Sequence, residues 1–257
     1  MKRVFALVLA ALMLMTVFAG CGKKSDDNEL NLVEPGKLIM STNAAFPPYE
    51  MTDDNGKFIG IDVEVAEAIA KKLGLELEID NMEFTAALEA AQKGKADMVM
   101  AGVTVDEDRL MVMDFSDSYA KGVQVVIVPE NSSITKLEDL EGKKIGTQMG
   151  TTGYIYCSDD YGEESVVAYD NGITAVQALL KGQIDCVVID NAPAQAFVKE
   201  NAGLKILDTE YAVEDYAIGF AKGNTALKDA VNKALAELIA DGTVQKIVDK
   251  YIPAEQK

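Results

Sequence analysis

The chain has 257 residues, of which 42 are acidic and 24 basic, and it contains no histidine. The resulting net charge of −18 argues against a nucleic-acid partner, because phosphate binding requires clustered positive charge. The absence of histidine excludes Ser-His-Asp and Cys-His catalysis and most zinc sites. With 49 % hydrophobic residues, the chain can bury a large core in one large domain or two small ones.

The N-terminus is typical of a secretory signal. Lys2 and Arg3 precede an apolar run over residues 4–17, and small residues then lead to Cys21. The run is short for a membrane span and no stop-transfer cluster follows it. We therefore expect a cleaved signal peptide over residues 1–20, and an extracytoplasmic protein.

Residues 18–21, Phe-Ala-Gly-Cys, resemble the bacterial lipobox, although Leu is more usual than Phe at its first position. The resemblance implies that Cys21 carries lipid and becomes the mature N-terminus. Residues 21–35 would then be a hydrophilic tether that holds the protein at the membrane surface. An ordinary signal peptide with an incidental cysteine is the alternative.

From residue 37 onward, short apolar runs alternate with amphipathic segments, which is typical of an α/β fold with mostly parallel strands. The pattern predicts strands over residues 38–41, 75–79, 98–101, 123–128, 144–147, 166–169, 186–189 and 217–220. It predicts helices over residues 62–73, 86–93, 151–161, 173–181, 226–240 and 244–251. The strand over 123–128 is continuous enough to be buried on both faces. No long Pro/Gly/Ser linker separates the two series of elements, which favours two lobes joined by extended crossings.

Two cysteines, Cys157 and Cys186, follow the predicted lipidation site. The first falls on a predicted helix and the second in a strand. Isolated cysteines without motif spacing are usually buried as small hydrophobes, and a disulfide, which export would permit, stays open as the alternative.

Six motifs together resemble bacterial solute-binding proteins of the polar amino acid transport family. They are STNAAFPPYE (41–50), GIDVEVAEAIAKKLG (60–74), AGVTVDEDR (101–109), DFSDSY (114–119), GTQMGTTG (146–153) and DCVVID (185–190). Each motif alone is weak, but six in register cover nearly the whole mature chain.

The resemblance implies a two-lobe periplasmic binding protein fold of type II, with a double-strand hinge. Residues 36–119 and 217–257 would form the first lobe and residues 120–216 the second, with hinge crossings near 119–123 and 211–216. Such a protein would be a monomer that captures a free L-amino acid and delivers it to an ABC transporter permease. No catalytic residue, metal or cofactor is implied.

The resemblance also implies a ligand site in the cleft between the lobes. Its residues are Asn43, Phe46, Phe84, Ala101, Gly102, Thr104, Arg109, Gln148, Thr151, Thr152 and Asp190. In relatives, the equivalents of Gly102, Thr104 and Asp190 bind the ligand ammonium, and two aromatic rings sandwich the side chain.

Arg109 is the expected carboxylate partner, because a planar guanidinium can form two parallel charge-assisted bonds that Lys cannot reproduce. A surface ion pair with Asp106 or Asp108 is the alternative. The segment Gly150–Gly153 lies at a predicted strand-to-helix junction, where free N–H groups and the helix dipole attract anions. A phosphate-binding loop would need the lysine of GxxxxGK[ST], which is missing.

Asp190 ends a predicted strand, and it could bind an ammonium, cap the following helix, or do both. Asn43 and Gln148 stand where relatives select the ligand side chain. Both are neutral amides, which favours a neutral polar ligand, although Glu50 or Glu83 could approach the pocket. A basic amino acid or cystine therefore stays open. Alternatives from other classes are an enzyme similar to cyclohexadienyl dehydratase and a surface amino-acid receptor.

Overall fold

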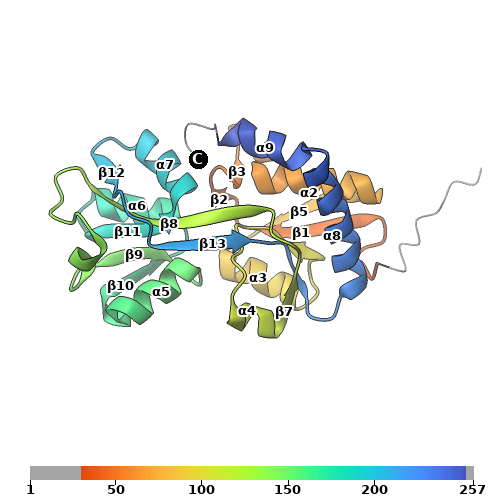
Figure 1. Ribbon diagram of the computed structural model, residues 1–257, viewed down its shortest axis with the longest axis horizontal. Coiled ribbons are helices and arrows are strands. Elements are labelled where there is room, and N and C mark those ends of the chain that lie inside the picture. The colour runs from red at the N-terminus through yellow and green to blue at the C-terminus, as the bar shows by residue number, and fades with distance from the viewer. Residues whose placement is uncertain (1–29, 253–257) are drawn as a thin grey trace, which may run out of the picture.

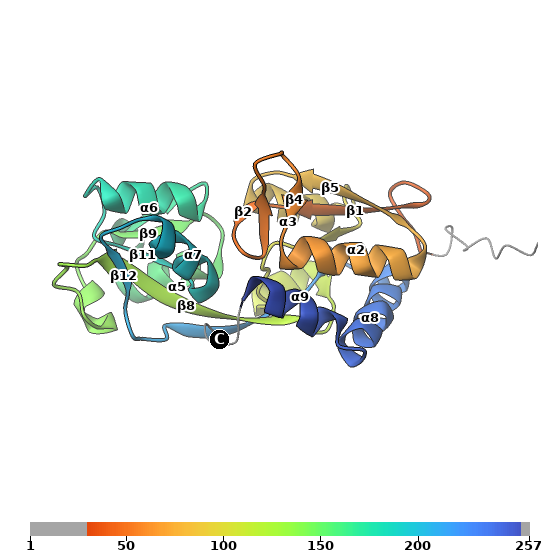
Figure 2. The same cartoon turned by 90° about the horizontal axis from the view of Figure 1, so that it is seen from above.

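The structure is a computed structural model, and it describes residues 30–252. Two lobes lie side by side along the long axis, and long strands run between them (Figures 1 and 2). The predicted signal peptide, the predicted lipidation site at Cys21 and most of the predicted tether lie outside the described residues. Within the described residues, no helix is both long and apolar enough to span a membrane.

The first lobe is built on a five-stranded sheet with helices on its faces. The strand order is β5 (Glu76–Asn81), β1 (Lys37–Thr42), β6 (Met98–Val99), β14 (Gly219–Ala221) and β7 (Met113–Phe115). The helices are α2 (Ile61–Leu73), α3 (Phe84–Gln92), α4 (Glu107–Val112), α8 (Thr225–Ala240) and α9 (Thr243–Tyr251). Apolar residues of α2 recur at helical spacing and are buried, and Gly74 ends this helix in the left-handed conformation.

The second lobe has a six-stranded sheet. Its order is β10 (Val166–Tyr169), β9 (Ile145–Gln148), β11 (Cys186–Asp190), β8 (Ala120–Pro129) and β12 (Leu204–Ile206), with β13 (Ala212–Tyr216) also paired to β8. The helices are α5 (Thr152–Tyr161), α6 (Gly172–Leu180) and α7 (Asn191–Glu200), and the short 3₁₀ helices are η1 (Leu137–Leu140) and η2 (Glu163–Ser165). A small third sheet, β2 (Ala45–Phe46), β3 (Glu50–Thr52) and β4 (Phe58–Ile59), belongs to the first lobe.

The crossings between the lobes are β8 and β13, which pair antiparallel from Tyr216 opposite Ala120 to Ala212 opposite Gln124. Both crossings coincide with the predicted hinge segments. That they bend as a hinge, and that the lobe boundaries lie at residues 120 and 216, stay predictions.

The expectation of mostly parallel strands is wrong, because seven of the eleven strand pairings in the described residues are antiparallel. The neighbours β5–β1–β6 and β10–β9–β11 are parallel, whereas β8 pairs antiparallel with β11, β12 and β13. In the first lobe, β14 is antiparallel to β6 and β7. In the two large sheets, every antiparallel pairing involves β8, which crosses between the lobes, or β14, which follows the return crossing. The small sheet β2–β3–β4 is antiparallel as well, because short turns connect its strands.

The second lobe buries the two cysteines in one apolar cluster. Cys157 lies on α5 and Cys186 on β11, both fully buried with free thiols. Burial raises the pKa of Cys157 to about 12, as expected for a thiol among apolar side chains. The thiols therefore act as core residues in this structure.

Candidate functional site

All eleven residues predicted to bind ligand line a single cavity between the two lobes. Four further residues line it, namely Glu50, Gln124, Val188 and Ile189. The first lobe contributes the ends of its strands and the start of α3, and the second contributes β9, the N-terminus of α5 and the end of β11. The carboxyl ends of strands in open α/β sheets commonly form ligand sites in this way.

Arg109 is held in the cavity wall by contacts to both lobes. Its Nη1 donates to the Thr104 carbonyl at 2.7 Å, and its Nη2 donates to the Gly150 carbonyl of the second lobe at 3.1 Å. The guanidinium carbon lies 5.6 Å from the ring centroid of Phe84, as in a cation–π contact. Its side chain is only 10 % exposed, and burial lowers the pKa of the guanidinium, which nevertheless stays charged.

The ion pair considered as the alternative role of Arg109 is also present. The Nε atom lies 3.3 Å from Asp106 Oδ2, and the Asp106 carboxylate accepts from the Arg109 backbone N–H as the N-cap of α4. The pair orients the guanidinium without removing it from the cavity, so the two roles coexist.

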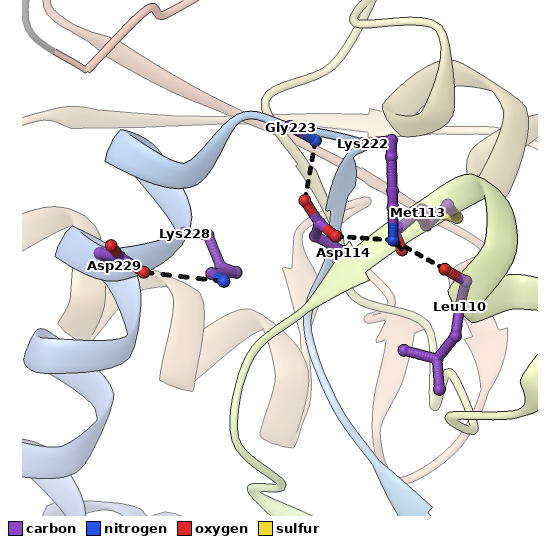
Figure 3. A network of polar contacts seen from close by, with 7 residues as sticks. All are labelled: Leu110, Met113, Asp114, Lys222, Gly223, Lys228 and Asp229. Carbon is purple, nitrogen blue, oxygen red and sulfur yellow. Dashed lines mark hydrogen bonds and ion pairs between the residues drawn. The ribbon is translucent and has the colours of Figure 1, made fainter.

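The helix that carries Arg109 is anchored at its far end by the strand returning from the second lobe (Figure 3). Lys222 donates to the carbonyl of Leu110 at 2.8 Å and pairs with Asp114 at 2.9 Å. Asp114 also accepts from the Gly223 backbone N–H at 2.7 Å. These contacts tie α4 and β7 to β14, so the short helix has a fixed position at the cleft.

The N-terminus of α5 opens onto the cavity from the second lobe. Thr151 is its N-cap: its hydroxyl donates to the Gln148 carbonyl at 2.8 Å and accepts from the Tyr154 N–H at 3.3 Å. Thr152, the first helical residue, is 3 % exposed. The first N–H groups of a helix have no intrahelical partner and attract anions, so this end of α5 suits a carboxylate.

Asp190 closes the cavity at the end of β11. It occupies the N-cap position of α7, but its side chain makes no capping hydrogen bond and instead accepts from Gln124 Nε2 at 2.8 Å. A Cβ atom on Gly122 would lie 2.4 Å from Asp190 Oδ1, so only glycine leaves room for this carboxylate. Burial, together with the nearby Glu214 carboxylate, raises the pKa of Asp190 to about 7.

Two aromatic rings form apolar walls of the cavity. Phe46 stacks on Tyr49 with ring centroids 5.7 Å apart, and Phe84 lies beside the Arg109 guanidinium. Gly102 has a φ of 55°, and a Cβ there would lie 2.8 Å from the Phe46 ring. The glycine therefore allows the binding loop to pass directly beside the aromatic wall.

The two predicted selectivity residues bond to each other across the cleft. Gln148 Nε2 donates to Asn43 Oδ1 at 3.0 Å, and Asn43 Nδ2 donates to the Met82 carbonyl at 2.8 Å. Together with the bond from Arg109 to Gly150, this contact joins the two lobes, so the structure has a closed cleft.

Residues 38–254 match the family described as bacterial extracellular solute-binding proteins, family 3. The chain belongs to this family. Among its relatives, the L-cystine-binding protein TcyJ of Escherichia coli (strain K12) is 32 % identical, with 96 % of this chain and 95 % of the relative covered. The arginine-binding extracellular protein ArtP of Bacillus subtilis (strain 168) is 31 % identical, with both chains fully covered.

Solved structures agree with this assignment. An ancestral arginine-binding protein bound to arginine is 44 % identical, with 84 % of this chain and 98 % of that chain covered and a TM-score of 0.79. An ancestral arginine-binding protein bound to glutamine is 43 % identical, with 85 % of this chain and 98 % of that chain covered and a TM-score of 0.81. The chain is thus an extracellular solute-binding protein with the two-lobe α/β fold, and the enzyme alternative is set aside.

Glu50, which the sequence indicated only as an acid that could approach the pocket, lines the cavity of this solute-binding protein. Its side chain is 0 % exposed, and neither carboxylate oxygen accepts a hydrogen bond from an N–H group or a hydroxyl of the described residues. Burial raises the pKa of Glu50 well above its ordinary value, and the carboxylates of Asp62 and Asp190 add to the effect. The sequence offered one indication of this role, because Glu50 is the last residue of the motif STNAAFPPYE (41–50).

Gln124 was not predicted from the sequence. It lies on β8, between the partly buried Val123 and the buried Val125, and it donates to Asp190 at 2.8 Å and to Glu214 at 2.9 Å. The signal was present, because a lone polar residue inside an apolar run that is buried on both faces needs a polar partner.

Proposed function

We propose that the protein captures a free amino acid outside the cytoplasm and delivers it to an ABC importer. The observation that carries the proposal is the pairing of opposite charges in one cavity, with Arg109 and the α5 N-terminus for a carboxylate and Asp190 for an ammonium. A zwitterion needs both, because burying either charge without a partner is costly. The relatives named for cystine and arginine binding support the same ligand class.

The division of the site between lobes explains how binding would close the cleft. Arg109 and Thr104 belong to the first lobe, whereas Thr152 and Asp190 belong to the second. A ligand that contacts both sets gains interactions only in the closed state, and it therefore shifts the population toward closure. The closed form is then the species that the importer would recognise.

For the ligand side chain, we propose a cationic amino acid, with arginine as the leading candidate. Two buried carboxylates, Glu50 and Asp190, line the cavity, against one guanidinium. Once Asp190 holds the α-ammonium and Arg109 the α-carboxylate, Glu50 is left over as the partner of a positive side chain. We therefore favour a cationic side chain over the neutral polar one that the amides of Asn43 and Gln148 suggested.

Cystine is a second candidate, supported by the relative named for its binding. Its second ammonium could meet Glu50, but its second carboxylate would need a further positive group. Arg109 is the only basic residue among those that line the cavity in the described part of the chain.

We also propose that lipid on Cys21 anchors the protein and that residues 21–35 act as the tether. A lipid-bearing cysteine would keep the binding lobes close to the importer in the membrane. Mass spectrometry of the mature N-terminus tests this part, and an unmodified Cys21 in the exported protein would contradict it.

A thermal-shift screen of the purified protein against each amino acid, including cystine, tests the proposed function. A ligand at 100 times its dissociation constant adds about 2.7 kcal/mol to the free energy of unfolding. We expect arginine to give the largest rise in melting temperature. A screen with no shift for any amino acid would contradict the binding function, whereas a shift for glutamine without one for arginine would contradict the cationic ligand alone.

A further inference from the structure

Glu50 is in contact with a second buried carboxyl group. The side chain of Asp62, from the first turn of α2, lies within hydrogen-bonding contact of Glu50, and both residues are 0 % exposed. Two carboxylates in contact inside a protein cannot both be ionised, because their repulsion is not screened by water. One proton must therefore lie between them or on one of them.

The donors around the pair determine where the charge resides. Asp62 accepts from the Gly102 backbone N–H at 3.0 Å and from the Tyr119 hydroxyl at 2.8 Å. No donor in the described part of the chain reaches Glu50. Hydrogen bonds favour the ionised form of Asp62, so the proton belongs to Glu50, which donates it to Asp62.

The other charged and titratable groups near Glu50 do not compensate for its charge. Asp190, from β11, adds negative charge, and the hydroxyls of Tyr49 and Tyr119 face the same cluster. Arg109 lines the same cavity, but its guanidinium bonds to carbonyl oxygens and to Asp106. An ionised Glu50 would thus be stabilised only by a positive charge brought in by the ligand.

We propose that Glu50 and Asp62 share one proton in the unliganded protein, and that a cationic ligand side chain expels this proton when it pairs with Glu50. The proposal rests on the proposed function, since it needs a cationic amino acid in the cavity. The step is a simple exchange in which the Glu50 O–H bond breaks, the proton passes to the buffer and the ligand cation takes its place. Binding of a cationic ligand then strengthens as the pH rises, and the protein favours capture at neutral over acidic pH.

The pair also connects the ligand to the inter-lobe crossing. Asp62 holds Gly102 of the binding loop and Tyr119, which immediately precedes β8. Removal of the shared proton ionises Glu50 and thereby takes away the hydrogen bond that it donates to Asp62, the residue that makes both contacts. Ligand charge, the binding loop and the crossing are therefore linked through one carboxyl pair.

Calorimetric titration of the purified protein with arginine, in buffers of different ionisation enthalpy, measures the protons released on binding. Citrulline is the matched control ligand, because it has the same length and α-groups but a neutral side chain. Asp190 also titrates in this range, and both ligands bring the same α-ammonium to it. The difference between the two ligands therefore isolates Glu50.

At about pH 8, where Asp190 is largely ionised before binding, we expect arginine to release up to about one proton per site and citrulline close to none. In the Glu50→Gln variant, the extra proton released by arginine should disappear. Asp62→Asn serves as a second variant, and it should reduce the release because Glu50 loses the group that holds its proton.

Three results would overturn the proposal. Tight arginine binding with no proton release beyond that of citrulline would overturn the shared proton and leave the proposed function intact. An undiminished release in a folded Glu50→Gln variant would assign the proton to another group. Failure of both arginine and lysine to bind the wild-type protein would contradict the cationic ligand itself.

Discussion

The part of the ligand cavity that we propose for the α-groups is built differently from the part that we propose for the side chain. In the part proposed for the α-groups, Arg109 makes bonds to both lobes and Asp190 accepts from Gln124, so these side chains are already oriented. In the part proposed for the side chain, Glu50 has no donor among the described residues and only another carboxyl beside it. The first part is preorganised for any amino acid, whereas the second becomes electrically balanced only with a particular ligand. Arg109 and Asp190 would therefore recognise any free amino acid, whereas Glu50 would select among amino acids by the charge of their side chains.

The largest effect should come from removing the guanidinium in the preorganised part. Arg109→Ala should weaken binding of every amino acid ligand by about 3 kcal/mol or more, because it strands a buried carboxylate. Calorimetry measures the loss. Lys136→Ala is the control, since this side chain is 61 % exposed and is not among the residues that line the cavity. A nearly unchanged affinity in the Arg109→Ala variant would show that Arg109 does not bind the ligand carboxylate.

Asp190, the other charged group in this part, should make the unliganded protein pH-sensitive. Its pKa of about 7 in the folded state exceeds the ordinary value of 3.8. The folded protein therefore retains a proton that the unfolded chain has lost, and stability from this group falls as the pH rises between the two values.

The Asp190→Asn substitution should remove this dependence. The unliganded variant should be more stable than wild type by up to about 4 kcal/mol at about pH 8, and similar to it at about pH 4. Denaturant unfolding at the two pH values measures the difference, and arginine binding should be lost in the same variant. An equal difference in the free energy of unfolding between variant and wild type at both pH values would contradict the raised pKa of Asp190.

A smaller and more selective effect is expected in the part proposed for the side chain. Glu50→Gln should weaken arginine binding by about 2 kcal/mol, as for loss of a charge-assisted hydrogen bond, while citrulline affinity changes little. The contrast with Arg109→Ala, which should affect both ligands, distinguishes selectivity from class recognition. An equal loss of affinity for arginine and for citrulline would show that Glu50 does not pair with the charged side chain of the ligand.

The smallest effect should follow from breaking the amide contact across the cleft. Gln148→Ala removes the bond to Asn43 and should weaken binding by about 1 kcal/mol, mainly through faster release, because the closed state loses one contact between lobes. Stopped-flow fluorescence of a labelled protein can follow release. Unchanged release would mean that the amide pair does not stabilise closure.

Most of the strands and helices were predictable because their apolar periodicity is strong, as in α2 and in the Val-rich part of β8. Short elements were not, since β7, β12 and the three strands around Glu50 have two or three residues each, too few to show a period. The antiparallel pairing of β8 depends on how the chain crosses between lobes, which local patterns do not record.

The cavity lining was predictable because its motifs end strands or start helices, where the fold brings them together. Glu50 could be named only as an acid able to approach the pocket, because its complete burial is a tertiary property that local patterns do not record. Its neighbour Asp62 lies in the first turn of a helix, where an acidic side chain normally faces water and stabilises the helix through its dipole. The sequence therefore offered no indication that Asp62 is buried. The proton shared by the two carboxyls is a tertiary property of residues 12 positions apart.

Titration of the purified protein with arginine and with agmatine tests the central claim most directly. Agmatine retains the guanidinium but lacks the α-carboxylate that Arg109 and the start of α5 would hold. The account predicts saturable binding of arginine at one site per chain and a loss of affinity of at least about 3 kcal/mol for agmatine. Equal affinity for the two compounds, or no arginine binding at all, would contradict it.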